Sequence, residues 1–320
     1  MVAGVTVTRL TPAQAERHAR LREERAIVAP HRGMVEWRVI FEFVLTFAAF
    51  WGAIVLAAAD TISLWVAFPI CTVASAMIYM PLHEATHMNI SGDNPRLNWL
   101  DEVIGRLSGS MFAFGFREHR ISHMKHHAHT NEPGRDPDML TAGSPWRLPG
   151  TFLLSTVMSL LTPLFFLVPP LRTRVPKFVI ARLGAGAVRG AEATRLASLR
   201  NMAEVSLLIV FSIAGFAAEA WILWYVATRL ALLWVAFIFG WFPHHPHQET
   251  ERYRDTRTAT FVGSTLLIRG HDHHLLHHLY PRVAHYRLPD LWSDIGPTLI
   301  ERGARVEGNA SPDGTPIIWH

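Results

Sequence analysis

Four apolar stretches of membrane-spanning length constrain this chain more than any other feature. Residues 39–59 and 62–80 are apolar runs separated by Asp60 and Thr61, and a longer stretch from about 205 to 242 is interrupted near residues 218–220. A helix of about 20 apolar residues crosses a bilayer, so the pattern predicts four spans. Half of the 320 residues are apolar, as in a membrane protein. The sequence therefore predicts an all-α membrane protein with two transmembrane helical hairpins.

The basic residues predict the orientation of these hairpins. The loop between them, residues 171–200, has a single acid, Glu192, and is otherwise basic, with Arg172, Arg174, Lys177, Arg182, Arg189, Arg195 and Arg200. The N-terminal segment is also rich in arginine. Because basic loops stay on the cytoplasmic side, both termini should be cytoplasmic and the two short turns should face the other side. The prediction is an integral, multi-pass membrane protein.

Two further apolar runs and one charge complicate this topology. Residues 107–116 are too short to span, and residues 151–170 are interrupted by prolines. We expect both runs to be interfacial or re-entrant, because a crossing at 151–170 would move the basic loop to the opposite side. Arg229 falls inside the fourth predicted span. A charge there is costly in lipid, so either it faces protein or the span boundary lies elsewhere.

Composition limits the domains and partners. We expect a cytosolic N-terminal segment at 1–38, a membrane and cap domain at 39–295, and a cytosolic C-terminal tail at 296–320. The only cysteine, Cys71, excludes disulfides, zinc ribbons and thiolate-held iron–sulfur clusters. The net charge of +4 is modest. Orientation and contacts with anionic membrane lipids explain the basic loops, so no nucleic-acid partner is expected.

Histidines gather at the predicted cytoplasmic ends of the spans. Sixteen of the 19 lie in residues 83–129 and 244–285. The spacing H-x-x-H-H occurs twice, and on a helix it turns three imidazoles to one side. Together with the pair of histidines after the second span, the two triples give eight candidate ligands: His83, His87, His123, His126, His127, His274, His277 and His278. A zinc ion takes four ligands, so eight imidazoles predict two metal ions. For the histidines outside this pattern, a role as metal ligand is no better supported than a structural role; these are His119, His129, His271, His273 and His285.

Two other functions compete for these histidines. The stretch from His83 to His87 spells H-E-x-x-H, the signature of zinc peptidases, in which Glu84 would activate a metal-bound water. An intramembrane zinc metallopeptidase would leave both H-x-x-H-H triples without a role. A metal transporter should hold its ligands within the spans, whereas these histidines cluster beyond their ends.

The three histidine boxes, in this order, resemble those of the membrane fatty acid desaturase superfamily. The similarity covers roughly residues 37–295 and extends to the flanking stretches "HHAHTNEPGRDPD" and "HHLYPRVAHYRLP". The resemblance implies a four-helix membrane stem and a cytosolic helical cap that holds a histidine-rich site with two Fe ions and uses O2 as co-substrate. It also implies a ninth ligand after the fourth span, best matched by His244 in "WFPHHPH", with His245 and His247 as alternatives.

The substrate class stays open at this point. The segments "PHHPH" and "HHLYPRVAHYRLP" are as similar to bacterial carotene hydroxylases as to acyl desaturases, and the first box departs from the H-x-x-x-x-H spacing of desaturases. The expected reaction is desaturation or hydroxylation of a fatty acyl chain or a carotenoid or terpenoid. We expect this hydrocarbon to approach from the bilayer between the stem helices, past residues such as Trp65, Phe68, Trp234 and Phe237.

The chemistry implies further groups around the metals. Iron with dioxygen can attack an unactivated C–H bond, whereas zinc has no redox chemistry. Carboxylates can orient the imidazoles through the free ring N–H, and the candidates are Glu84, Asp136, Asp138 and Asp272. The chain has neither a cysteine cluster nor a glycine-rich flavin or nicotinamide fingerprint. Electrons are therefore expected from an external donor of the ferredoxin or cytochrome type, with its reductase.

Overall fold

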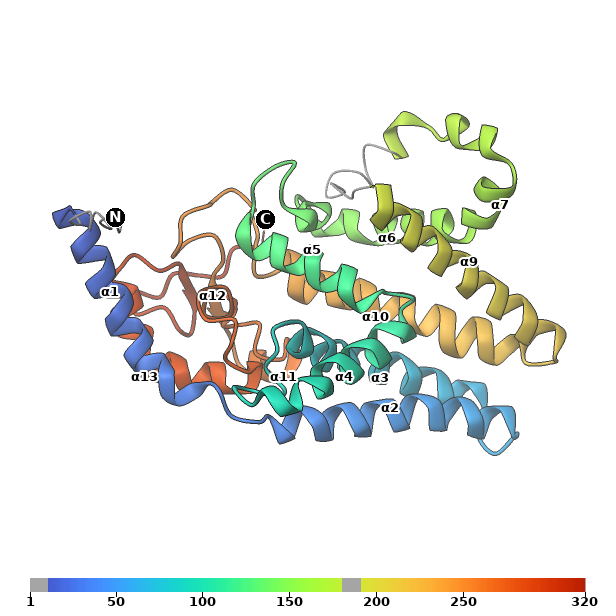
Figure 1. The fold of residues 1–320 in the computed structure, drawn as a ribbon, viewed down its shortest axis with the longest axis horizontal. Coiled ribbons are helices and arrows are strands. Elements are labelled where there is room, and N and C mark those ends of the chain that lie inside the picture. Colours follow the sequence, from blue (N-terminus) through green and yellow to red (C-terminus); the bar gives the residue numbers. More distant parts are fainter. Residues whose placement is uncertain (1–10, 180–190, 320) are drawn as a thin grey trace, which may run out of the picture.

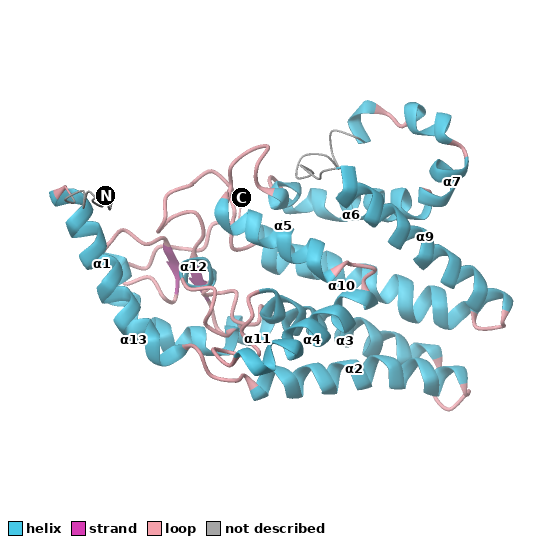
Figure 2. Cartoon of the chain, in the orientation of Figure 1, coloured by secondary structure: helices cyan, strands magenta, loops and turns pink. Residues whose placement is uncertain are grey.

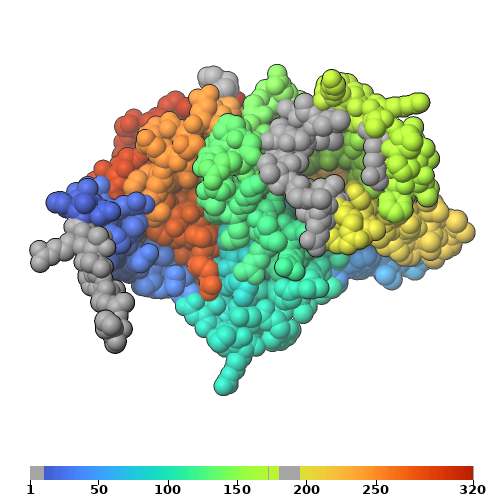
Figure 3. Space-filling model, turned by 45° about the horizontal axis from the view of Figure 1, so that its top comes forward, coloured from blue at the N-terminus to red at the C-terminus, as the bar shows by residue number. Residues whose placement is uncertain are grey.

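The computed structural model describes residues 11–179 and 191–319, which fold into helices and two short strands (Figures 1 and 2). The four longest helical stretches form a stem at one end, residues 98–128 and 148–167 lie beside it, and the N-terminal and C-terminal segments form a cap at the other end (Figure 1). In the space-filling view the cap shows the blue N-terminal helix beside the orange and red C-terminal segments (Figure 3). Arg182 and Arg189 of the predicted basic loop lie outside the described residues.

The stem confirms the predicted four spans. Helices α2 (Trp37–Ala58) and α3 (Leu64–Thr86) form the first hairpin, and α9 (Ala191–Ile213) precedes a fourth span at Glu219–Trp241. That fourth span consists of α10 (Ala227–Val235) between two wider π-helical segments, Glu219–Val226 and Ala236–Trp241. All four are long and apolar enough to cross a membrane, which makes this an integral, multi-pass membrane protein.

Two boundaries of these spans differ from the prediction. Helix α3 continues past the expected end at residue 80 to Thr86, so the H-E-x-x-H stretch lies on its last turn rather than after it. The second hairpin turns before Glu219, where the fourth span begins, instead of at residues 218–220. Neither shift changes the number of spans.

Arg229 lies inside the fourth span and faces protein, which was the first of the two alternatives for this residue. Its guanidinium binds both carboxylate oxygens of Glu204 on α9, each at 2.6 Å, and lies 4.4 Å from the ring centre of Tyr225. The side chains of Arg229 and Glu204 are 16% and 2% exposed. A paired charge of this kind avoids the cost of an isolated charge in lipid, so Arg229 is compatible with a membrane-spanning helix.

The expectation for residues 107–116 was wrong for most of the run. These residues comprise the end of α4 (Asn98–Met111) and the turn before α5 (Phe116–Ala128). Met111, Phe112 and Phe116 are buried in the core that includes α2 and α3. Their apolar character comes from packing inside the protein rather than from contact with the membrane surface.

Residues 151–170 do not form a span. They divide into α6 (Leu148–Leu160) and α7 (Thr162–Leu167), and neither is among the helices long enough to cross. The 13 residues of α6 reach about 20 Å at about 1.5 Å per residue, short of the roughly 30 Å of a bilayer core.

The cap joins both ends of the chain. Helix α1 (Pro12–Val28) packs on α13 (Leu288–Glu301) around a core that also contains residues of α12 (His274–Leu279). Strands β1 (Thr258–Thr260) and β2 (Val306–Gly308) pair in parallel, and the short helix α11 (Ser264–Leu267) follows β1. The fold is therefore all-α as predicted, except for these two strands of three residues each. The expected boundary at 295/296 falls inside α13, so residues 296–319 pack with the cap.

Candidate metal centre

Four segments far apart in the sequence bring the predicted ligands together between stem and cap. His83 and His87 lie at the end of α3, the first triple lies on α5, and the second lies on α12. His244 lies in the turn that follows the fourth span. Because α3 continues beyond the predicted span, its final turn carries imidazoles into the cap. Most of the nine imidazoles are buried; His127 and His278 are half-buried.

The imidazoles fall into two groups of four. In each group, one nitrogen per residue lies within 4.8 Å of the others; the first group is His83, His87, His123 and His277, and the second is His126, His244, His274 and His278. His127 lies between the groups. Its Nε2 is 3.1 Å from Nε2 of His123 and 3.0 Å from Nε2 of His277, and its ring stacks on His278 at 4.2 Å.

Hydrogen bonds between imidazoles do not explain this arrangement. A ring nitrogen has one in-plane site, which holds either a proton or a lone pair, so it takes part in one N–H···N bond. Nε2 of His123 lies close to two others, 2.9 Å from Nε2 of His87 and 3.1 Å from Nε2 of His127. Among the described residues, neither ring nitrogen of His83 has a hydrogen-bond partner. Converging lone pairs of this kind fit a shared cation.

The separations fit nitrogens that share an ion. Two nitrogens bound at about 2.1 Å to one ion lie about 3 to 3.4 Å apart when they occupy neighbouring positions. The Nε2–Nε2 distances are 2.9, 3.0, 3.0 and 3.1 Å, one of them between His244 and His274 in the second group. The chemistry of imidazole allows iron, copper, zinc or nickel at such a site.

Burial keeps most of these imidazoles neutral. It lowers the pKa well below the ordinary value, and nearby imidazoles lower it further, for His123, His127, His244, His274, His277 and His278. A neutral imidazole has a lone pair available for a metal. Burial also lowers the pKa of His126, but Asp138 and Asp136 outweigh it, so the net shift is upward.

Two side chains orient imidazoles of the second group. Asp136 accepts a hydrogen bond from Nδ1 of His126 at 2.8 Å, which leaves Nε2 for a metal. Asp138 is more distant, with its carboxylate 3.6 Å from the same nitrogen. Thr130, which sequence reasoning missed, lies with its hydroxyl 3.1 Å from Nδ1 of His278 and leaves the other ring nitrogen without a partner among the described residues.

The other two candidate carboxylates contact histidines outside both groups. One oxygen of Glu84 accepts hydrogen bonds from the backbone N–H and the Nδ1 of His285, and the other accepts from Asn89 at 2.6 Å. Asp272 accepts from the hydroxyls of Ser264 and Thr265, each at 2.7 Å, and lies 3.1 Å from Nδ1 of His273. Neither carboxylate is hydrogen-bonded to a grouped imidazole within residues 11–179 and 191–319.

Sequence reasoning also left out His271, which borders the first group. It is 1% exposed, its ring centre lies 5.2 Å from that of His83, and it packs on Phe239 at 3.6 Å. His119 similarly stacks on His123 at 6.1 Å. A signal was present, because His119 precedes His123 by one turn of α5 and His271 lies three residues before His274. His129 instead contacts Arg135 and Glu132.

The alternatives for the ninth ligand lie close by but outside the groups. The ring of His245 packs on Trp241 at 4.7 Å, and Nε2 of His247 lies 3.4 Å from the hydroxyl of Thr141. Only His244 of the three belongs to one of the two groups. The turn after the fourth span therefore presents one imidazole to the centre and directs two elsewhere.

Comparison with known proteins agrees with this geometry. A family model described as "Fatty acid desaturase" matches residues 60–308, over three quarters of the chain. No curated protein matches the sequence. The matched region contains all three histidine boxes and His244, together with three of the four spans. The chain belongs to the fatty acid desaturase family.

Proposed function

We propose that this protein is a membrane-bound, O2-dependent di-iron oxidoreductase that desaturates or hydroxylates a lipid-soluble hydrocarbon. The observation that carries the proposal is the pair of four-histidine groups, with His127 between them. Iron with dioxygen supplies an oxidant strong enough for an unactivated C–H bond. The substrate is a fatty acyl chain or a carotenoid or terpenoid.

The two histidine groups divide the ligands between two ions. His83, His87, His123 and His277 would hold one iron, and the short distances from His127 to His123 and His277 support the same ion for His127. His126, His244, His274 and His278 would hold the other. Asp136 and Thr130 bind the Nδ1 atoms of His126 and His278 and so fix the direction of their rings.

The contacts of Glu84 argue against the zinc-peptidase alternative. A general base must lie within hydrogen-bond reach of the metal-bound water. The carboxylate of Glu84 instead accepts hydrogen bonds from His285 and Asn89, and within residues 11–179 and 191–319 it has none with a grouped imidazole. A peptidase would also leave the group of His126, His244, His274 and His278 without a function.

An apolar pocket of about 610 Å³ beside the fourth span suits the hydrocarbon. Its lining contains no charged side chain and includes Trp146, Leu148, Trp234, Phe237, Trp241 and Trp319. Trp241 is buried and packs on His245, next to His244, so the pocket ends close to the second histidine group. Pockets of this size and character bind apolar ligands. We place the unreactive part of the substrate here.

Two of the four aromatic residues expected to line the substrate path are in this pocket, and two are not. Trp234 and Phe237 line it. Trp65 lies at the start of α3, opposite to the end that carries His83, and is 90% exposed. Phe68 packs against the core of the first hairpin. The path therefore runs along the fourth span instead of between all four helices.

Metal content together with turnover tests the proposed function. Purified without chelators, active protein should carry about two irons per chain, because nine imidazoles exceed the needs of one ion. Oxygen consumption in the presence of an electron source should depend on that iron, and mass spectrometry of host lipids and carotenoids should reveal the oxidised product. Full activity with a single zinc per chain would overturn the proposal.

A further inference from the structure

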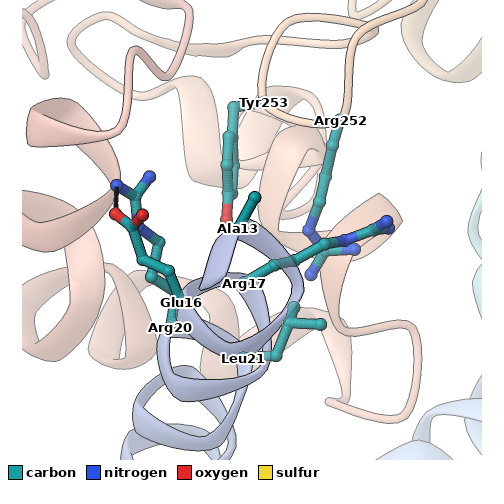
Figure 4. Close-up of a pocket in the computed structure, with 7 residues that line it drawn as sticks. All are labelled: Ala13, Glu16, Arg17, Arg20, Leu21, Arg252 and Tyr253. Atoms are coloured by element: carbon teal, nitrogen blue, oxygen red, sulfur yellow. Dashed lines mark hydrogen bonds and ion pairs between the residues drawn. The ribbon is translucent and has the colours of Figure 1, made fainter. Parts of the chain in front are cut away.

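Two pockets of this protein differ in the chemistry of their walls. One lies in the cap beside α1, has a volume of about 230 Å³, and is lined mostly by charged and polar residues: Ala13, Glu16, Arg17, Arg20, Leu21, Arg252 and Tyr253 (Figure 4). The larger pocket, beside the fourth span, has an apolar lining. Burying charged groups against a hydrocarbon costs free energy, so a hydrocarbon fits the larger pocket and not the one in the cap.

The larger pocket runs along one side of the fourth span. Five of its lining residues lie on that span: Leu230, Leu233, Trp234, Phe237 and Trp241. Because they recur about once per helical turn, they share one side of the span and extend over roughly 15 Å. Residues at the start of α6 form a second wall. The pocket is therefore elongated, with one end within the stem and the other at the cap.

Trp319 lies at the cap end of this pocket and comes from the segment that follows β2. Its ring centre is 5.2 Å from that of Phe242 and 6.5 Å from that of Trp241. Both partners are at the end of the fourth span that leads into the cap, whereas Leu230 lines the other end of the pocket. The indole is 47% exposed, so part of its surface can contact a bound molecule. A hydrocarbon that lies along the fourth span therefore meets Trp319 at the cap end.

A buried arginine holds the segment that carries Trp319. The side chain of Arg257 is fully buried, and its Nη1 donates to the carbonyl of Ile318 at 3.0 Å and to the carboxylate of Glu307 at 2.5 Å. The same carboxylate accepts the backbone N–H of Ile318 at 2.9 Å. Both backbone polar groups of the residue before Trp319 are therefore bonded. Hydrogen bonds to charged groups are stronger than neutral ones, so the indole is held in place before a ligand enters.

The same arginine connects Trp319 to the turn that carries a candidate metal ligand. Nε and Nη2 of Arg257 donate to the carbonyl of Phe242 at 2.9 and 2.6 Å. Phe242 lies two residues before His244, a member of the second histidine group. One side chain therefore fixes the position of Trp319 relative to the metal centre. A barrier at a constant distance from this centre determines how far a hydrocarbon can enter and which of its carbons lies nearest the histidines.

We propose that Trp319 closes the cap end of the apolar pocket and limits the length of hydrocarbon that the pocket accepts. The inference rests on the proposed function and adds a specificity-determining residue to it. A short chain does not reach Trp319, a chain that just fills the pocket packs on the indole, and a longer chain clashes with it. Each buried methylene changes affinity about fourfold, so chains that differ by two carbons at this limit differ about tenfold in affinity.

Binding to the metal-free protein tests this limit independently of catalysis. The full chain in detergent is loaded with the methyl ester of cis-parinaric acid, a fluorescent hydrocarbon, which is then displaced by saturated methyl esters lengthened two carbons at a time. Comparing variants at each length cancels the partition of the esters into detergent. In Trp319→Ala, short esters should bind as in wild type, esters at the limit should bind more weakly, and longer esters should bind about tenfold more tightly. Trp319→Phe should give an intermediate result.

The change of sign with chain length distinguishes a barrier from a general loss of folding, which would weaken all esters alike. Trp99→Ala is the matched control, because Trp99 on α4 is also an exposed tryptophan and does not line the pocket. This variant should keep the length limit of wild type. The proposal is wrong if wild type shows no limit, if Trp319→Ala keeps the same limit, or if it changes affinity uniformly at all lengths.

Iron content and oxygen consumption separate this inference from the proposed function. Within the described residues Trp319 has no ring contact with a grouped histidine, so Trp319→Ala should bind as much iron as wild type. If wild type binds iron and consumes O2 but Trp319→Ala keeps its length limit, the role of Trp319 is refuted and the proposed function stands. If the protein binds no iron, the proposed function has failed, while a shifted limit in metal-free Trp319→Ala would still support the barrier.

Discussion

The carboxylate of Glu84 accepts two hydrogen bonds from His285, one from its backbone N–H at 2.8 Å and one from its Nδ1 at 2.9 Å. The glutamate of the H-E-x-x-H stretch therefore joins the end of α3 to the segment after α12. Helices α3 and α12 both carry candidate ligands, so Glu84 holds together two sides of the metal centre. This contact favours a structural role for Glu84 over the role of general base that it would have in a zinc peptidase.

Paired substitutions test that distinction. His277→Ala should lose bound iron and turnover together, because it removes a proposed ligand. Glu84→Gln should cost about 10–100-fold in iron affinity or activity, since it alters only the support of that centre. Iron content and turnover are measured on the same preparations. Loss of activity with metal retained in Glu84→Gln, combined with a silent His277→Ala, would restore the peptidase interpretation.

Asp136 and Asp138 provide a matched pair of carboxylates. Asp136 is buried and binds His126 at 2.8 Å, whereas Asp138 lies 3.6 Å away with a side chain 44% exposed. We expect Asp136→Asn to lower iron affinity by about 10–100-fold, because the ring of His126 loses its fixed acceptor. Asp138→Asn should have a clearly smaller effect. Chelator competition measures both, and equal effects would contradict the assigned role of Asp136.

The buried pair of Arg229 and Glu204 should matter for stability. Arg229→Met leaves the carboxylate of Glu204 without its partner, and we expect a loss of about 3–5 kcal/mol in the free energy of unfolding. Adding Glu204→Leu to the same chain should recover most of that loss, because no charge is then left unpaired inside the stem. Thermal unfolding in detergent compares the variants. An unaffected Arg229→Met protein would show that Glu204 can be neutralised at little cost.

Topology can be tested with single cysteines in a Cys71→Ser background. We expect a cysteine at Lys177, after α7, to react with a membrane-impermeant reagent only once the cytoplasmic face is opened. A cysteine at Thr61, in the turn of the first hairpin, should react from the opposite face in intact cells. Labelling of both positions from the same side would mean that residues 151–170 cross the membrane after all.

The apolar pocket predicts where substrate affinity resides. Phe237→Ala should weaken binding of the hydrocarbon by about 10-fold or more and raise KM, because an aromatic contact of about 2 kcal/mol is removed. Turnover at saturating substrate should change little, since Phe237 contacts no grouped histidine among the described residues. Trp65→Ala serves as the control, because Trp65 lies at the opposite end of the stem. An equal rise in KM for both variants would move the binding site elsewhere.

The sequence by itself determined the number of spans and the chemistry of the centre. Span length depends only on a run of apolar residues, and the H-x-x-H-H spacing turns three imidazoles to one side of any helix. Both properties are local, so they can be recognised without knowing what the helix packs against. The family resemblance added His244, because its spacing follows no helical repeat.

Tertiary structure decided which side chains meet. Glu84 and His285 are 201 residues apart, and no local period predicts their contact. The same holds for the position of His127 between two groups, and for the choice of Asp136 over Asp272 as the partner of a grouped imidazole. Such pairings depend on how α3, α5, α12 and the fourth span pack together. Packing is set by the shapes of whole helices, which short motifs do not encode.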